Sequence, residues 1–187
     1  MKEQKYIQTI FTEKAPQPGD YSQAKKIFVG TGWLVYTSAI GPDFTAEEQK
    51  TGQVKNRQDE AERLGGYIKP YDMPEQTKKA LTNLEAVLSE AGAELTHIVK
   101  INALLSQGNY ARIDNMFSEF AQAYNNYFES KGITENLPAR APTLVKELPW
   151  PGYLLLLDAV AFIPNTELGK TLKKLDEIQG KKQTMVD

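Results

Sequence analysis

The order of apolar segments along the chain predicts one domain built from a sheet and two helices. Strand-like runs come first, then a helix, a strand and a second helix, and extended segments complete the pattern. Two helices can cover only one face of a sheet, so we expect all helical packing on one side. The length of 187 residues fits a single domain with a substantial core.

The first part of the chain is typical of strands followed by a polar insertion. Residues 6–11 alternate weakly, and residues 26–29 and 33–37 are rich in β-favouring side chains. A Gly-Thr-Gly turn at residues 30–32 separates the last two runs, which predicts a β-hairpin. Residues 41–73 are polar with little apolar periodicity, and we interpret them as a surface insertion into the domain.

Two amphipathic helices are predicted, with a strand between them. The first spans residues 74–91, because Pro74 suits a first helical turn, apolar residues follow at helical spacing and Gly92 comes just past the end. Residues 97–105 form a strand-like run, and residues 110–130 form the second helix. The apolar stripe of this second helix consists of Ile113, Met116, Phe117, Phe120, Tyr124 and Tyr127 or Phe128.

The remaining segments are expected to be extended. Three prolines in residues 137–149 exclude a helix and favour an edge strand. Residues 153–163 are the most apolar run and predict a strand buried on both faces. Because the helices cover only one of these faces, we expect copies of the chain to cover the other. Residues 165–187 form a polar tail beyond a single domain that spans residues 1–164.

Composition excludes several classes of function. The chain has 22 basic and 24 acidic residues, and this net charge of -2 argues against a nucleic-acid-binding protein. It has no cysteine and one histidine, His97, which excludes disulfides, cysteine ligands and a multi-histidine metal site within one chain. Residues 153–163 are too short to cross a bilayer, and the N-terminus lacks an apolar leader, so we expect a cytoplasmic protein without membrane association.

Two charged residues stand out as candidates for chemistry. Asp158 lies in the apolar run, where a buried carboxylate is costly unless it is paired or functional. Arg140 lies between small residues in a proline-stiffened stretch, which suits two-point capture of a carboxylate. A structurally paired Asp158 and a solvated Arg140 are the alternatives that the sequence leaves open.

Five ordered motifs together resemble the RidA/YjgF family. GDYSQA at residues 19–24 is similar to the family's GPYSQA segment, and LVYTS at 34–38 resembles its strand ending in TSG. The family's helix motif is matched by QT at 76–77, ALTNLEAVL at 80–88 and AG at 91–92. VK at 99–100 matches the start of its next strand. The C-terminal motif is matched by PAR at 138–140, LP at 148–149 and DAVA at 158–161.

The resemblance implies a chorismate-mutase-like α+β fold, with two helices on a mostly antiparallel six-stranded sheet and three copies forming a barrel. It also implies a cofactor-free enamine/imine deaminase that acts on small carboxylate-bearing imines such as 2-iminopropanoate. Arg140 would clamp the substrate carboxylate, and Asp158 would position or activate water. Tyr21 and Ser38 would line the pocket, Tyr21 from a neighbouring subunit.

Four positions depart from the family pattern. Ala39 replaces a glycine, Asp114 an asparagine and Pro142 a cysteine, while Asp158 is shorter than the usual glutamate. We therefore place Ala39 and Asp114 at the substrate and keep a second hypothesis, a trimer that binds or senses small carboxylates without turnover. An endoribonuclease is a third, less favoured reading, because the chain lacks a basic excess.

Overall fold

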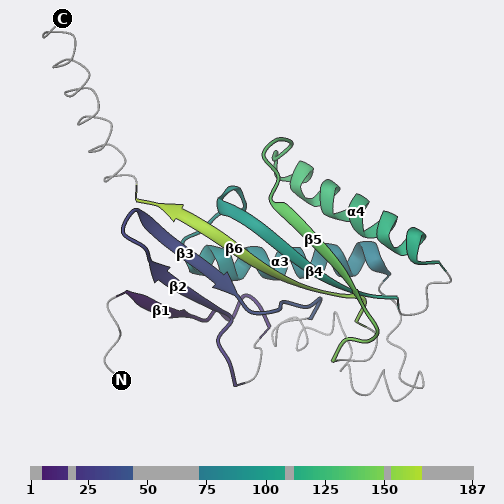
Figure 1. Ribbon diagram of the computed structural model, residues 1–187, viewed down its shortest axis with the longest axis horizontal. Coiled ribbons are helices and arrows are strands. Elements are labelled where there is room, and N and C mark those ends of the chain that lie inside the picture. The colour runs from purple at the N-terminus through teal and green to yellow at the C-terminus, as the bar shows by residue number, and fades with distance from the viewer. Residues whose placement is uncertain (1–5, 17–19, 44–71, 108–111, 150–152, 166–187) are drawn as a thin grey trace, which may run out of the picture.

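A computed structural model describes residues 6–16, 20–43, 72–107, 112–149 and 153–165. Within these ranges one six-stranded sheet has the order β1-β2-β3-β6-β4-β5. All neighbouring strands are antiparallel except β4 and β5, which are parallel. Figure 1 shows α3 passing behind the strands while α4 lies next to β5. This arrangement confirms the predicted α+β fold with two helices on a mostly antiparallel sheet.

The N-terminal strands form as the sequence predicts. β1 (Ile7–Ile10) pairs with β2 (Ala24–Phe28), and β2 pairs with β3 (Gly32–Thr37) through the expected hairpin. The Val29 amide donates to the Gly32 carbonyl at 2.9 Å, and Gly30 has a φ of 82°, a conformation that favours glycine. The predicted insertion lies almost entirely outside the described residues, which resume at Asp72.

Both helices begin and end close to the predicted residues. α3 (Met73–Glu90) is capped by Asp72, whose side chain accepts a hydrogen bond from the Glu75 amide at 3.1 Å. A short 3-10 turn, η1 (Leu95–His97), precedes β4 (Ile98–Ser106), and α4 (Ile113–Ser130) follows. Met116, Phe120, Tyr124, Tyr127 and Phe128 of the α4 stripe are buried, whereas Ile113 and Phe117 are 45% and 39% exposed. At the start of α4 the apolar stripe therefore extends past the surface that the other described residues cover.

The C-terminal strands set the geometry of the sheet. β5 (Ala139–Val145) lies at the edge, as its prolines predicted, and β6 (Leu155–Pro164) lies between β3 and β4. Burial alternates along β6: Leu155, Leu157, Ala159 and Ala161 are buried, and the residues between them are half-buried. Within a single chain only one face of β6 is fully buried, so burial of the second face still depends on the expected contact with copies of the chain. No helix within the described residues covers its second face.

The sheet thus has a helix side and an open side. On the helix side, the core joins strand residues such as Val35 and Ile101 to the inward faces of α3 and α4. On the open side, cross-strand pairs bring apolar side chains together, among them Leu34 with Phe162 and Leu104 with Leu156. Neither described helix combines the length and the apolar character needed to cross a bilayer.

Candidate functional site

Asp158 lies in the middle of β6 and projects from the open side of the sheet. Its register partner in β4 is Asn102, whose side-chain amide donates to the Asp158 carboxylate at 2.8 Å. Both residues are half-buried among apolar neighbours. One carboxylate oxygen is held by Asn102, and no other partner of Asp158 occurs among the described residues. The carboxylate is therefore oriented by a neutral donor and has no neutralising cation there.

Ser38 and Ala39 lie beside Asp158 because the strand ladder contains a bulge. Tyr36 pairs with Val160, and the next bridge joins Ile40 to Leu157, so three residues of one strand face two of the other. The Ala159 amide donates to the Thr37 hydroxyl at 2.9 Å inside this bulge. Three residues singled out in the sequence, Ser38, Ala39 and Asp158, are thus brought together.

Tyr21 lies at the surface, near a loop that a buried glutamine holds in place. The Gln23 side chain is fully buried, accepts from the Thr12 amide and donates to the carbonyls of Thr12, Ala15 and Pro16. The Ser38 hydroxyl and amide both donate to the Gln23 carbonyl, which ties the bulge to the same loop. Tyr21 itself is 55% exposed. Its exposure leaves the ring available to a neighbouring molecule.

Arg140 projects from β5 toward the helix side and packs against α4. Its guanidinium carbon lies 4.6 Å from the ring centre of Tyr124 and 5.3 Å from that of Phe120. Within the described residues, the buried Nη1 atom has no hydrogen-bond partner, and neither has the buried Tyr124 hydroxyl. Stacking on aromatic rings fixes the plane of a guanidinium while its N–H edge remains able to donate. Arg140 is therefore a half-buried cation, held against two rings, with no anionic partner in the part of the chain that the structure describes.

Arg140 and Asp158 do not meet within one chain. Arg140 pairs with Ile101, which pairs with Ala159, so these three side chains share the helix side of the sheet. Asp158 is adjacent to Ala159 in the strand and therefore points to the opposite side. The two residues expected to act on one substrate project from opposite faces of the same sheet.

Asp114 belongs to neither group of residues. It lies in the first turn of α4, and its carboxylate accepts from the Arg112 guanidinium at 2.6 and 3.0 Å. This hydrogen bond from Arg112 is the main cause that lowers the pKa of Asp114, which is fully solvated. The sequence placed this carboxylate at the substrate. In the single chain, Arg112 balances its negative charge at the surface, and its place at the substrate stays a prediction.

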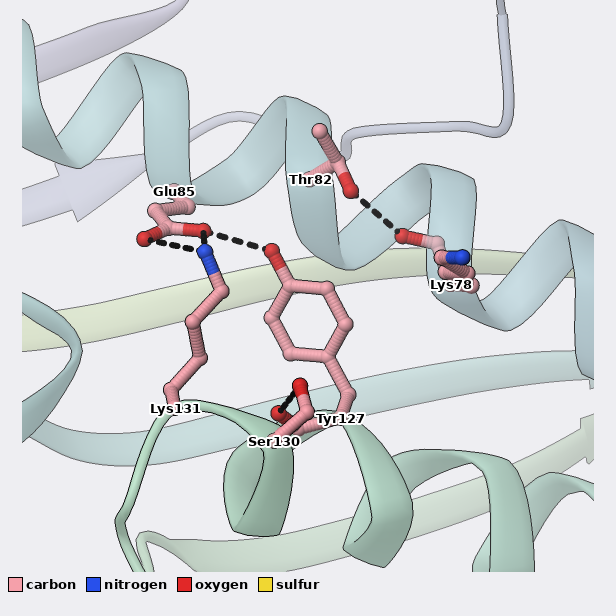
Figure 2. A network of polar contacts seen from close by, with 6 residues as sticks. All are labelled: Lys78, Thr82, Glu85, Tyr127, Ser130 and Lys131. Atoms are coloured by element: carbon pink, nitrogen blue, oxygen red, sulfur yellow. Dashed lines mark hydrogen bonds and ion pairs between the residues drawn. The ribbon is translucent and has the colours of Figure 1, made fainter.

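Figure 2 shows a polar contact between the two helices. The Tyr127 hydroxyl donates to the Glu85 carboxylate at 2.6 Å, and Lys131 donates to both oxygens of the same carboxylate at 3.0 and 2.8 Å. Burial is the main cause that raises the pKa of Tyr127, so its phenol remains a donor. The contact joins α3 to the C-terminal half of α4.

Sequence reasoning missed two residues of this arrangement. Asn102 was part of a strand-like run, and Tyr124 was counted as part of a core stripe. A polar side chain in an apolar strand was the available signal for Asn102. A tyrosine in a buried stripe was the signal for Tyr124, because its hydroxyl needs a partner.

Comparison with known proteins agrees with the fold and the motifs. A family model described as Endoribonuclease L-PSP matches residues 12–163. A RutC family protein of Pyrococcus abyssi is 33% identical over 156 residues, which are 83% of this chain and 96% of that protein. A 2-iminobutanoate/2-iminopropanoate deaminase of Dermatophagoides farinae is 32% identical over 143 residues, 75% of this chain and 84% of that one.

A solved structure gives the same result at the level of the fold. The crystal structure of the YjgF gene product from E. coli aligns with a TM-score of 0.58 and 26% identity, covering 83% of this chain and 98% of that one. The two helices on a mixed six-stranded sheet thus define a chorismate-mutase-like protein. With the family match over most of its length, the chain belongs to the Rid/YjgF family.

Proposed function

We propose that the chain is an enamine/imine deaminase that hydrolyses small carboxylate-bearing imines, such as 2-iminopropanoate, to a ketoacid and ammonia. The observation that carries the proposal is Arg140, a cation held against two aromatic rings, with a buried N–H group that has no acceptor among the described residues. A substrate carboxylate supplies that acceptor. The name of the deaminase from Dermatophagoides farinae supports the same reaction class for this chain.

The reaction needs few groups from the protein. Water adds to the imine carbon, a proton passes to the nitrogen, and the carbon–nitrogen bond breaks to release ammonia and leave the ketoacid. Arg140 orients the substrate through its carboxylate, which is the main contribution expected of a binding clamp. Asp158 accepts the proton of the attacking water and returns one to the leaving nitrogen. Asn102 holds one carboxylate oxygen, which leaves the second available to water. We expect no cofactor.

The opposite orientations of Arg140 and Asp158 require more than one copy of the chain at each site. The proposed assembly is the homotrimer expected from the sequence, with sites in the clefts between subunits. Two features support it: the apolar open side of the sheet, and the exposed Ile113 and Phe117 at the start of α4. Tyr21 would reach the cleft from a neighbouring subunit. A cytoplasmic location, and the absence of nucleic-acid and membrane partners, remain predictions from the sequence.

A second function is favoured by the same geometry. If the carboxylate of Asp158 never reaches the ligand bound by Arg140, the protein binds or senses small carboxylates and does not turn them over. The substitution of a glycine by Ala39 beside Asp158 favours this alternative, since it narrows the space at the bulge. Both functions use Arg140 as the anion receptor, and they differ in the role of Asp158.

Turnover of an imine that is generated in situ distinguishes the deaminase from the carboxylate-binding protein. A dehydratase generates 2-iminopropanoate, and pyruvate formation is followed with wild type, Arg140→Ala and Asp158→Asn. We expect acceleration by wild type and loss of most of it in both variants. Arg112→Ala is the matched control, because Arg112 is an exposed arginine paired with Asp114. It should retain the wild-type rate.

Each outcome of this experiment assigns a function. No acceleration by wild type over buffer would contradict the deaminase. In that case, binding of pyruvate that Arg140→Ala abolishes would establish the carboxylate-binding alternative. Acceleration that survives Asp158→Asn would keep the deaminase but remove Asp158 from its mechanism.

A further inference from the structure

Two buried polar groups in contacting side chains lack partners. Tyr124 is 2% exposed, and its hydroxyl oxygen forms no hydrogen bond with any described residue; the buried Arg140 Nη1 atom is equally unpaired there. Buried polar groups in folded proteins are nearly always paired, so such an exception needs an explanation. Here the two exceptions belong to one stacked pair, with the guanidinium carbon 4.6 Å from the Tyr124 ring centre. Neighbouring unpaired groups indicate a shared missing partner.

The chemistry of the two groups specifies that partner. A guanidinium offers only donors. Burial raises the pKa of Tyr124 to about 12, although the charge of Arg140 lowers it in part, so the phenol carries its proton at neutral pH. Both groups therefore lack an acceptor, and a group with two acceptor oxygens at a short spacing satisfies both. A carboxylate has this form and carries the charge that Arg140 lacks.

The rings of α4 also determine how Arg140 can bind. Phe120 and Tyr124 both lie within cation–π distance of the guanidinium, so their rings hold it in place. A stacked guanidinium donates only from its edge, in the plane of its N–H groups. Phe120 has no polar atom to add. Of the two rings, only Tyr124 both packs against the guanidinium and carries a hydrogen-bond donor.

We propose that Tyr124 is a substrate-binding residue: its ring fixes the guanidinium of Arg140, and its hydroxyl donates a second hydrogen bond to the substrate carboxylate. The proposal deepens the function proposed above and rests on it for the identity of the ligand. Because the Arg140 Nη1 atom and the Tyr124 hydroxyl are both buried, we expect the ligand to displace the side chains that cover these two atoms. The pair selects ligands with a free carboxylate over esters or amides of the same shape.

Binding of pyruvate, the product of the proposed reaction, tests this assignment without requiring turnover. Titration calorimetry compares wild type with Tyr124→Phe, which keeps the ring and removes only the hydroxyl. We expect binding to weaken about tenfold, the effect of losing one hydrogen bond to a charged group. Tyr127→Phe is the matched control: it removes another hydroxyl from α4, one already bonded to Glu85. Its pyruvate affinity should equal that of wild type.

A melting experiment separates binding from a structural role. In the free protein, Tyr124→Phe should melt at the same temperature as wild type or higher, because it removes an unpaired buried hydroxyl. The increase in melting temperature on adding pyruvate should nevertheless shrink, and methyl pyruvate should shift neither protein. Tyr124→Leu, which removes the ring as well, should weaken binding further than Tyr124→Phe.

The outcomes distinguish this inference from the proposed function. Equal pyruvate affinity of wild type and Tyr124→Phe would overturn the role of the hydroxyl, even if the deaminase is active. Absence of pyruvate binding to wild type at millimolar concentration would overturn the anion site itself. Weakened binding in Tyr124→Phe together with no imine turnover by wild type would support the site and reject the deaminase.

Discussion

Asp158 occupies a strand position whose neighbours on the same face are mostly apolar. Leu156 and Val160 flank it along β6, and Asn102 faces it across the sheet. A half-buried carboxylate in such surroundings loses hydration, and a hydrogen bond from an amide offsets part of that loss. The Asn102 contact is therefore both a structural support and the means by which the carboxylate keeps one orientation.

Removing this donor is expected to destabilise the protein. Asn102→Leu keeps a similar volume but leaves Asp158 without a hydrogen bond, and we expect the free energy of unfolding to fall by about 1–3 kcal/mol. Urea denaturation at neutral pH measures the change. In the Asn102→Leu background, Asp158→Asn should restore part of the lost free energy of unfolding, because no charge is then left unpaired. An unchanged midpoint in Asn102→Leu would show that the hydrogen bond contributes nothing.

Residue type alone identified Arg140 and Asp158 as candidates, but it did not identify their partners. Asn102 and Asp158 are 56 positions apart and meet only through strand register. Register depends on which faces of the strands are buried and on bulges such as the one at Ser38 and Ala39, and no short sequence window contains that information. For the same reason, the sequence did not reveal that Arg140 and Asp158 point to opposite sides.

At the scale of elements, local signals were sufficient. Pro74 predicts the start of α3, which Asp72 caps, and the glycine turn predicts the hairpin. The helix and the hairpin were therefore predicted to within one or two residues. The length of the apolar stripe in α4 did not predict its burial, because Ile113 has the right spacing and is nevertheless 45% exposed. Helical periodicity indicates which side chains can be buried, and tertiary packing decides which of them are.

The contact between α3 and α4 makes a prediction at this scale. Tyr127→Phe removes the hydroxyl that donates to Glu85, and we expect a loss of about 1–2 kcal/mol in the free energy of unfolding. Lys131→Ala should cost less, about 0–1 kcal/mol, because this ion pair is substantially exposed. Chemical denaturation of both variants measures the difference. A larger loss in Lys131→Ala than in Tyr127→Phe would mean that the exposed ion pair, and not the buried phenol, joins the helices.

At the scale of the whole molecule, the two faces of the sheet have different roles. The helix side contains the core and, at its edge, Arg140 on its aromatic support. The open side carries the Asp158–Asn102 pair amid apolar residues that one chain leaves half-buried. A single chain therefore separates the proposed anion receptor from the proposed acid/base group. The proposed association of copies would cover the apolar face and would bring Arg140 of one copy and Asp158 of another to one cleft.

This requirement predicts that association and turnover are lost together. Light scattering should show wild type at three times the chain mass of 21.0 kDa. Val160→Asp places a second carboxylate on the open side, next to Asp158, and should yield a folded monomer without deaminase activity. Ser89→Asp, an equal change at an exposed position of α3, should leave the trimer and its rate intact. A monomeric wild type with full activity would contradict both the trimer and the shared cleft, and Arg140 would then have to act without Asp158.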